Sequence, residues 1–165
     1  MTTRFLVLAL GLAAAVFIDV RTRRIPNALT ASMALTGVAL AATAGNGITV
    51  AQSLLGMLVG FVLMLLAHVF GASGAGDLKL VTAIGALVGP TPELRVVLYT
   101  FVAGGAIALG VAAHRGLLAT TFAGARQLVV APAGAREVVS APARGNRFAY
   151  APAIALGTFV ALVLG

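Results

Sequence analysis

The sequence contains no cysteine and few charged residues. Without cysteine, the 165-residue chain has no disulfide, no cysteine-ligated zinc site and no thiol nucleophile. Only 9% of its residues are charged, whereas soluble domains carry about 25%. Hydrophobic residues make up 61% and the mean hydropathy is +1.09, which predicts a helical membrane protein. The polar stretches are too short to bury a second core, so we expect a single domain over residues 1–165.

Negative charge is scarcer than positive charge, with four acidic residues against eleven Lys and Arg and a net charge of +7. The basic residues cluster in a few places and do not alternate with aromatic residues. This pattern indicates membrane topology and argues against nucleic-acid binding. The acidic residues are Asp19, Asp77, Glu93 and Glu137. Asp19 and Asp77 border apolar segments, where an ionisable side chain is costly and therefore a functional candidate.

Apolar segments occur at residues 5–20, 28–44, 50–70, 80–89, 96–113 and 148–164, and residues 90–95 are expected to form a turn. The segment 80–89 is short, and the positions of the basic residues decide whether it crosses the membrane. If it crosses, the arginines at 21–24, Lys79 and the basic loop 114–147 all lie on the cytoplasmic side, as the positive-inside rule requires. We therefore predict an all-α, polytopic membrane protein with six transmembrane helices and both termini outside. Asp19 and Asp77 then lie at the cytoplasmic face.

Two carboxylates at one membrane face suit the chemistry of aspartic proteases. Like charges a few ångströms apart resist joint ionisation, so the pair can share one proton. One carboxylate then acts as general base on a water molecule while the other polarises the scissile carbonyl. Gly74 and Gly76 lack Cβ atoms and would let an extended substrate backbone approach Asp77 closely.

Simpler structural roles also fit these aspartates. Asp77 suits the N-cap of a helix that follows a glycine-rich turn, and Asp19 suits an interfacial acid paired with Arg23 or with a neighbouring helix. Lys79 is expected either to attract an acidic substrate segment or the carboxylate pair, or to anchor its helix at the cytoplasmic face. The two carboxylates on one face, with their flanking residues, favour the catalytic interpretation.

Two prolines and one asparagine near these segments are further candidates. Pro26 and Asn27 are expected to shape the turn that presents Asp19. Pro152 interrupts the last apolar segment, where it is expected either to free a backbone carbonyl that meets the substrate or, as we prefer, simply to kink the helix.

Three stretches resemble the type IV prepilin leader peptidases, the bacterial GxGD aspartyl proteases of the membrane. They are residues 19–27 (DVRTRRIPN), residues 74–80 (GAGDLKL) and residues 150–157 (YAPAIALG). In its short length and its lack of cysteine, the chain resembles the small members of this family that serve tight-adherence pili. Those members lack the N-terminal cytoplasmic domain with its cysteine metal motif.

The resemblance implies catalytic roles for Asp19 and Asp77. Because the sequence shows no cofactor motif and no ligand cluster near its histidines, we expect no metal and no cofactor. It also implies removal of prepilin leader peptides at the cytoplasmic face of the bacterial cytoplasmic membrane. The expected partners are therefore prepilin-like substrates and membrane lipid, and not nucleic acid.

Two other functions fit parts of the sequence. Residues 71–74 (GASG) match the GxSG motif of rhomboid serine proteases, with Ser73 as nucleophile and His114 as its base. Such a motif arises easily by chance in a chain rich in glycine and alanine, and it leaves Asp19 without a role. The second alternative is a proton or ion transporter that relays through Asp19 and Asp77, although no inverted repeat with broken helices is evident.

Overall fold

The computed structural model describes residues 2–43, 47–70, 73–114 and 149–164. Within these ranges all regular structure is helical, which confirms the all-α prediction for this part of the chain. The helices are α1 (Thr2–Thr22), α2 (Asn27–Ala42), α3 (Val50–Val69), α4 (Ala75–Val88), α5 (Pro90–His114) and α8 (Ala151–Val163). Apart from His114, the predicted basic loop 114–147 lies outside the described residues.

Three of the helices are long and apolar enough to cross a membrane, and two shorter ones are also apolar. The long candidate spans are Thr3–Thr22, Val50–Val69 and Pro90–Val111, and the shorter apolar helices are Asn27–Ala42 and Ala151–Val163. The remaining helix, α4, has 14 residues and is about 21 Å long at 1.5 Å per residue. These apolar helices identify the chain as a membrane protein.

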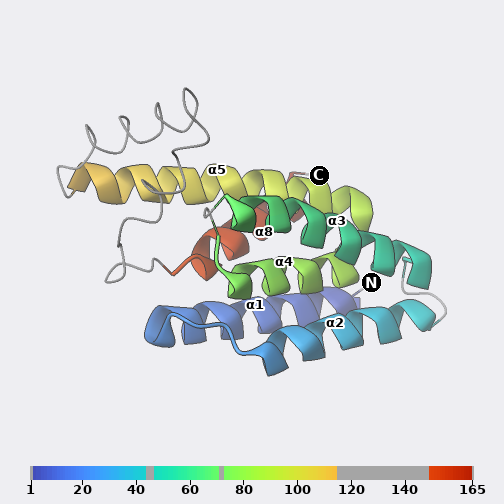
Figure 1. Cartoon of the computed structure of the whole chain (residues 1–165). Coiled ribbons are helices and arrows are strands. Elements are labelled where there is room, and N and C mark those ends of the chain that lie inside the picture. Colours follow the sequence, from blue (N-terminus) through green and yellow to red (C-terminus); the bar gives the residue numbers. More distant parts are fainter. Residues whose placement is uncertain (1, 44–46, 71–72, 115–148, 165) are drawn as a thin grey trace.

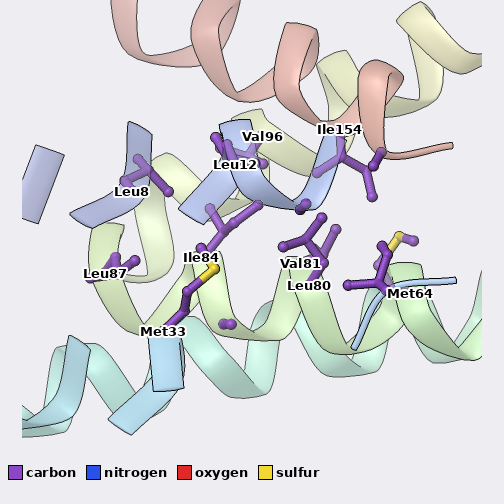
Figure 2. Close-up of a cluster of buried hydrophobic side chains, with 14 of the residues drawn as sticks. Leu8, Leu12, Met33, Met64, Leu80, Val81, Ile84, Leu87, Val96 and Ile154 are labelled. Atoms are coloured by element: carbon purple, nitrogen blue, oxygen red, sulfur yellow. The ribbon is translucent and has the colours of Figure 1, made fainter. Parts of the chain in front are cut away.

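Helix α4 lies at the centre of the bundle and contacts each of the other five described helices (Figure 1). Nine of its 14 residues are buried, because its apolar side chains point in every direction around its axis. Leu80, Val81 and Ile84 are fully buried. Figure 2 shows them among side chains from α1, α2, α3, α5 and α8, such as Leu12 and Ile154.

Glycines let the neighbouring helices approach α4 closely. A Cβ atom on Gly56 of α3 would lie 2.9 Å from the carbonyl carbon of Gly85, so the two backbones touch at this crossing. At the next residue of α4, a Cβ on Gly37 of α2 would lie 2.9 Å from the carbonyl carbon of Ala86. These contacts hold α4 between α2 and α3 and thereby determine where its first turn lies.

The connection between α4 and α5 differs from the predicted one. Residues 90–95 were expected to form a turn, but α5 already begins at Pro90, so that prediction is wrong. Gly89 has a φ of +84°, which turns the chain between the two helices, and Pro90 suits a first helical position because the N–H that it lacks would have no partner there. Glu93 is consequently fully buried against Gly60 of α3.

The starts of two helices determine the roles of their first residues. Helix α4 begins at Ala75, close to Asp77, so Asp77 and Lys79 belong to its first turns. Helix α8 begins at Ala151, which makes Pro152 its second residue. The predicted kink at Pro152 is wrong, because a proline in the first turn breaks no hydrogen bond within the helix.

Candidate active site

Five helix ends surround a cavity of about 650 Å³ at one end of the bundle. They are the ends of α1 and α3 and the starts of α2, α4 and α8. The cavity lining includes the residues with polar or ionisable side chains Asp19, Arg23, Arg24, Asn27, His68, Ser73, Asp77, Lys79 and Tyr150. Gly74 and Gly76 line the same cavity. The fold therefore brings together most of the candidate residues from the first and middle thirds of the sequence.

Asp19 lies in the last turn of α1 and is only 5% exposed. Its Oδ2 atom accepts a hydrogen bond of 3.0 Å from the backbone N–H of Ala151, the first residue of α8. This arrangement suits a carboxylate, because the start of a helix carries a partial positive charge. Arg23 has a φ of +53° and donates its backbone N–H to the carbonyl oxygen of Asp19 at 2.7 Å, where the helix ends.

Asp77 is the third residue of α4 and is 9% exposed. Its Oδ2 atom accepts a hydrogen bond of 2.9 Å from the backbone N–H of Gly74, the residue that caps the helix. Asp77 is thus not itself the N-cap, although its side chain satisfies one of the amides at the helix start. A Cβ on Gly76 would lie 3.3 Å from the Cβ of Ile25, so this glycine allows the segment after α1 to pack against α4.

The two carboxyl groups interact electrostatically in this cavity. Asp77 precedes the apolar run that starts at Leu80 and lies at the polar end of the bundle. The pKa of Asp77 is raised to about 6, chiefly by burial. The negative charge of Asp19 also raises this pKa, whereas the Gly74 hydrogen bond and the charge of His68 lower it. Burial also raises the pKa of Tyr150, and the charge of Asp77 raises it further.

A polar contact joins the starts of α2 and α4. Lys79 donates a hydrogen bond of 2.9 Å from Nζ to Oδ1 of Asn27, the first residue of α2. Pro26 precedes α2 with an extended backbone (φ −64°, ψ 135°). Asn27 and Lys79 line the cavity, whereas Pro26 and Pro152 are not among the described residues that line it. Pro26 follows the cavity residue Ile25, so its position agrees with a role in shaping the turn after α1.

The residues of the serine-protease alternative are only partly brought together. Ser73 lines the cavity, and its backbone oxygen lies 2.8 Å from Nδ1 of His68. Its buried hydroxyl has no hydrogen-bond partner among the described residues. His114, the expected base, is absent from the described part of the cavity lining. The described residues also contain no cluster of three or more His, Asp or Glu side chains that could hold a metal ion.

Sequence reasoning missed two contributors to the site. Tyr150 was noticed only as part of the third motif, although a tyrosine at the polar end of an apolar segment is a signal that could have singled it out. The Ala151 N–H that binds Asp19 could not have been found, because a backbone donor carries no side-chain signature.

Comparison with known proteins supports the assignment of this chain as a peptidase. The sequence profile of the type IV leader peptidase family matches residues 6–109, which is more than half of the chain and includes Asp19 and Asp77. Neither a curated protein nor a solved structure matches the chain.

The phenol of Tyr150 reports on the charge of Asp77. The change Asp77→Asn removes that charge, so the pKa of Tyr150 should fall, while burial should still hold it above its ordinary value. Absorbance of the phenolate would measure this in a Tyr99→Phe background, because the chain contains only two tyrosines. Ser73→Ala, a change without charge in the same cavity, should leave the pKa of Tyr150 unchanged. Equal values with and without Asp77→Asn would contradict the arrangement of the cavity.

Proposed function

The chain belongs to the type IV leader peptidase family and is therefore a membrane peptidase, and we propose that it removes the leader peptides of prepilin-like substrates. We propose further that it is an aspartic endopeptidase whose catalytic dyad is Asp19 and Asp77. The observation that carries this proposal is that two acidic residues far apart in the sequence line one cavity. Each carboxyl group is held there by a backbone N–H at the start of a helix.

The surroundings of the two carboxyl groups support different roles for them. Asp77, whose pKa is raised by burial, is suited to carry the shared proton and to donate it to the scissile carbonyl oxygen. Asp19, which accepts the Ala151 N–H, is suited to take a proton from water as that water attacks the carbonyl carbon. The resulting diol collapses when Asp19 passes its proton to the peptide nitrogen and Asp77 takes a proton back from a diol hydroxyl. The C–N bond then breaks, which yields a free carboxyl group and a free amine and restores the dyad.

We propose that the bundle lies in the cytoplasmic membrane of a bacterium and that its cavity end faces the cytoplasm. Arg23, Arg24 and Lys79 are exposed residues that line the cavity, and positive charge prefers the cytoplasmic side. At the opposite end, Arg4 is buried and donates a hydrogen bond to the Leu87 carbonyl oxygen. It is therefore not an exposed positive charge at that end. This orientation corresponds to six transmembrane helices with both termini outside.

The positions of the aspartates favour this proposal over a transporter. Asp19 and Asp77 both lie at one end of the bundle, which suits a reaction at one membrane face better than a relay across the membrane. The substrate proposed for the peptidase is accordingly a leader peptide that reaches the cavity from the membrane surface, with lipid around the rest of the bundle.

Leader removal tests the dyad directly. The chain would be co-expressed with a candidate prepilin, and the product would be followed by its mass. Asp19→Asn and Asp77→Asn keep the shape of the side chains but should lower cleavage by about a hundredfold or more, because each removes one proton-transfer group. Ser73→Ala, in the same cavity, should cleave normally. Normal cleavage by either asparagine variant would refute the dyad, and loss of cleavage in Ser73→Ala would favour the serine mechanism.

The orientation can be tested with single cysteines, because the chain has none of its own. Arg24→Cys places a thiol at the cavity end, and Thr91→Cys places one at the opposite end; both positions are exposed. In intact cells a membrane-impermeant thiol reagent should label Thr91→Cys, and it should label Arg24→Cys only after the cells are permeabilised. The reverse pattern would show that the cavity faces outward.

A further inference from the structure

We infer that Tyr150 is a positioning residue, which fixes the start of α8 against α5 so that the Ala151 N–H holds Asp19 in the cavity. The inference rests on the proposed function, because it gives Asp19 a catalytic role. Tyr150 itself takes no part in the proton transfers described above. Its importance would come from the backbone that it holds in place.

The phenol ring of Tyr150 is anchored on α5. Its hydroxyl donates a hydrogen bond of 3.4 Å to the carbonyl oxygen of Thr100. A Cβ on Gly104 would lie 2.6 Å from both Cε2 and Cζ of the ring, so the ring rests directly on the backbone of this glycine. Farther along α8, a Cβ on Gly157 would lie 2.6 Å from Oγ1 of Thr100. Helix α8 is thus held against α5 both before its first residue and in its middle.

Backbone hydrogen bonds link Tyr150 to the start of α8. The carbonyl oxygen of Tyr150 accepts hydrogen bonds from the N–H groups of Ala153 at 3.0 Å and Ile154 at 3.2 Å. Tyr150 is therefore bonded into the first turn of the helix that follows it. The next residue, Ala151, is fully buried and donates to Asp19. A displacement of the ring would consequently displace the donor that Asp19 needs.

Pro152 leaves Ala151 as the one amide in the first turn of α8 that can bond to Asp19. A proline has no N–H, and the N–H of Ala153 is already bonded to Tyr150. Among the first three residues of α8, only Ala151 can therefore donate to Asp19. A small rotation of the helix start cannot be compensated by a neighbouring amide. This explains why the anchor of Tyr150 matters for a carboxyl group on another helix.

Neighbouring glycines on α5 provide a matched pair of test variants. Gly104→Ala adds a methyl group that meets the Tyr150 ring, whereas Gly105→Ala adds the same group where nothing lies within 4 Å. With the prepilin as substrate, Gly104→Ala should lower kcat by about tenfold and leave KM within about twofold, since a small misplacement of a catalytic group slows the reaction itself. Gly105→Ala should change neither constant. Equal effects of the two changes would overturn the inference.

A double variant separates positioning from packing. In a Tyr150→Ala background no ring remains to be displaced, so Gly104→Ala should cause no additional loss of kcat. A tenfold loss that persists in this background would show that the methyl group acts in another way. Tyr150→Phe keeps the ring and loses only the Thr100 hydrogen bond, and it should reduce kcat by no more than about threefold. A loss as large as that of Gly104→Ala would assign the effect to the hydroxyl and overturn the role of the ring.

Hydrogen exchange at the Ala151 amide tests the contact without any activity measurement. Asp19→Ala removes its acceptor, so exchange of this amide should accelerate in that variant and in Gly104→Ala, and remain slow in Gly105→Ala. Unchanged exchange in Gly104→Ala would overturn the inference even if the enzyme cleaves prepilin. If the wild-type chain cleaves no prepilin but its amide responds as expected, the proposed function fails while the positioning contact stands.

Discussion

The burial of α4 is the constraint on which the rest of this structure depends. Helix α4 is apolar over most of its length, and the other five described helices pack around it. In a membrane, lipid would cover an apolar face equally well, so close packing contacts are what hold these helices together. The glycine crossing at Gly56 and Gly85 brings α3 against it at backbone distance. Once α4 is enclosed in this way, its first turn emerges at one end of the bundle. Asp77 is consequently held at the border between the apolar core and a polar cavity.

Both carboxyl groups of the proposed dyad are held in the same way, by a backbone N–H at the start of a helix. The N–H of Gly74 at the start of α4 binds Asp77, and the N–H of Ala151 at the start of α8 binds Asp19. Two helix starts thus point their donors at two acids, which suits the negative charge that a dyad must retain. Asp19 comes from the first helix and its donor from the last. The site therefore forms only when the whole bundle is closed.

Hydropathy and charge predicted much of this arrangement. The apolar segments became helices, with α3 beginning at the predicted Val50, and the scarcity of acids singled out Asp19 and Asp77. The prediction for residues 90–95 is wrong because two prolines and two charged residues are typical of a turn, whereas Pro90 starts a helix and Glu93 is buried. The contacts of Ala151 with Asp19, and of Tyr150 with Gly104, depend on tertiary packing, and no local pattern could have predicted them.

The central claim is that Asp19 and Asp77 meet in one cavity closely enough for one charge to act on the other. Its most direct test is an infrared titration of the Asp77 carboxyl band, isolated as the difference between a protein and its Asp77→Asn counterpart. In the wild-type chain the pKa of Asp77 should be about 6. In an Asp19→Asn background the pKa should fall, because the neighbouring negative charge is gone while burial remains. An unchanged pKa in that background would show that the two carboxyl groups do not interact, and would contradict the account.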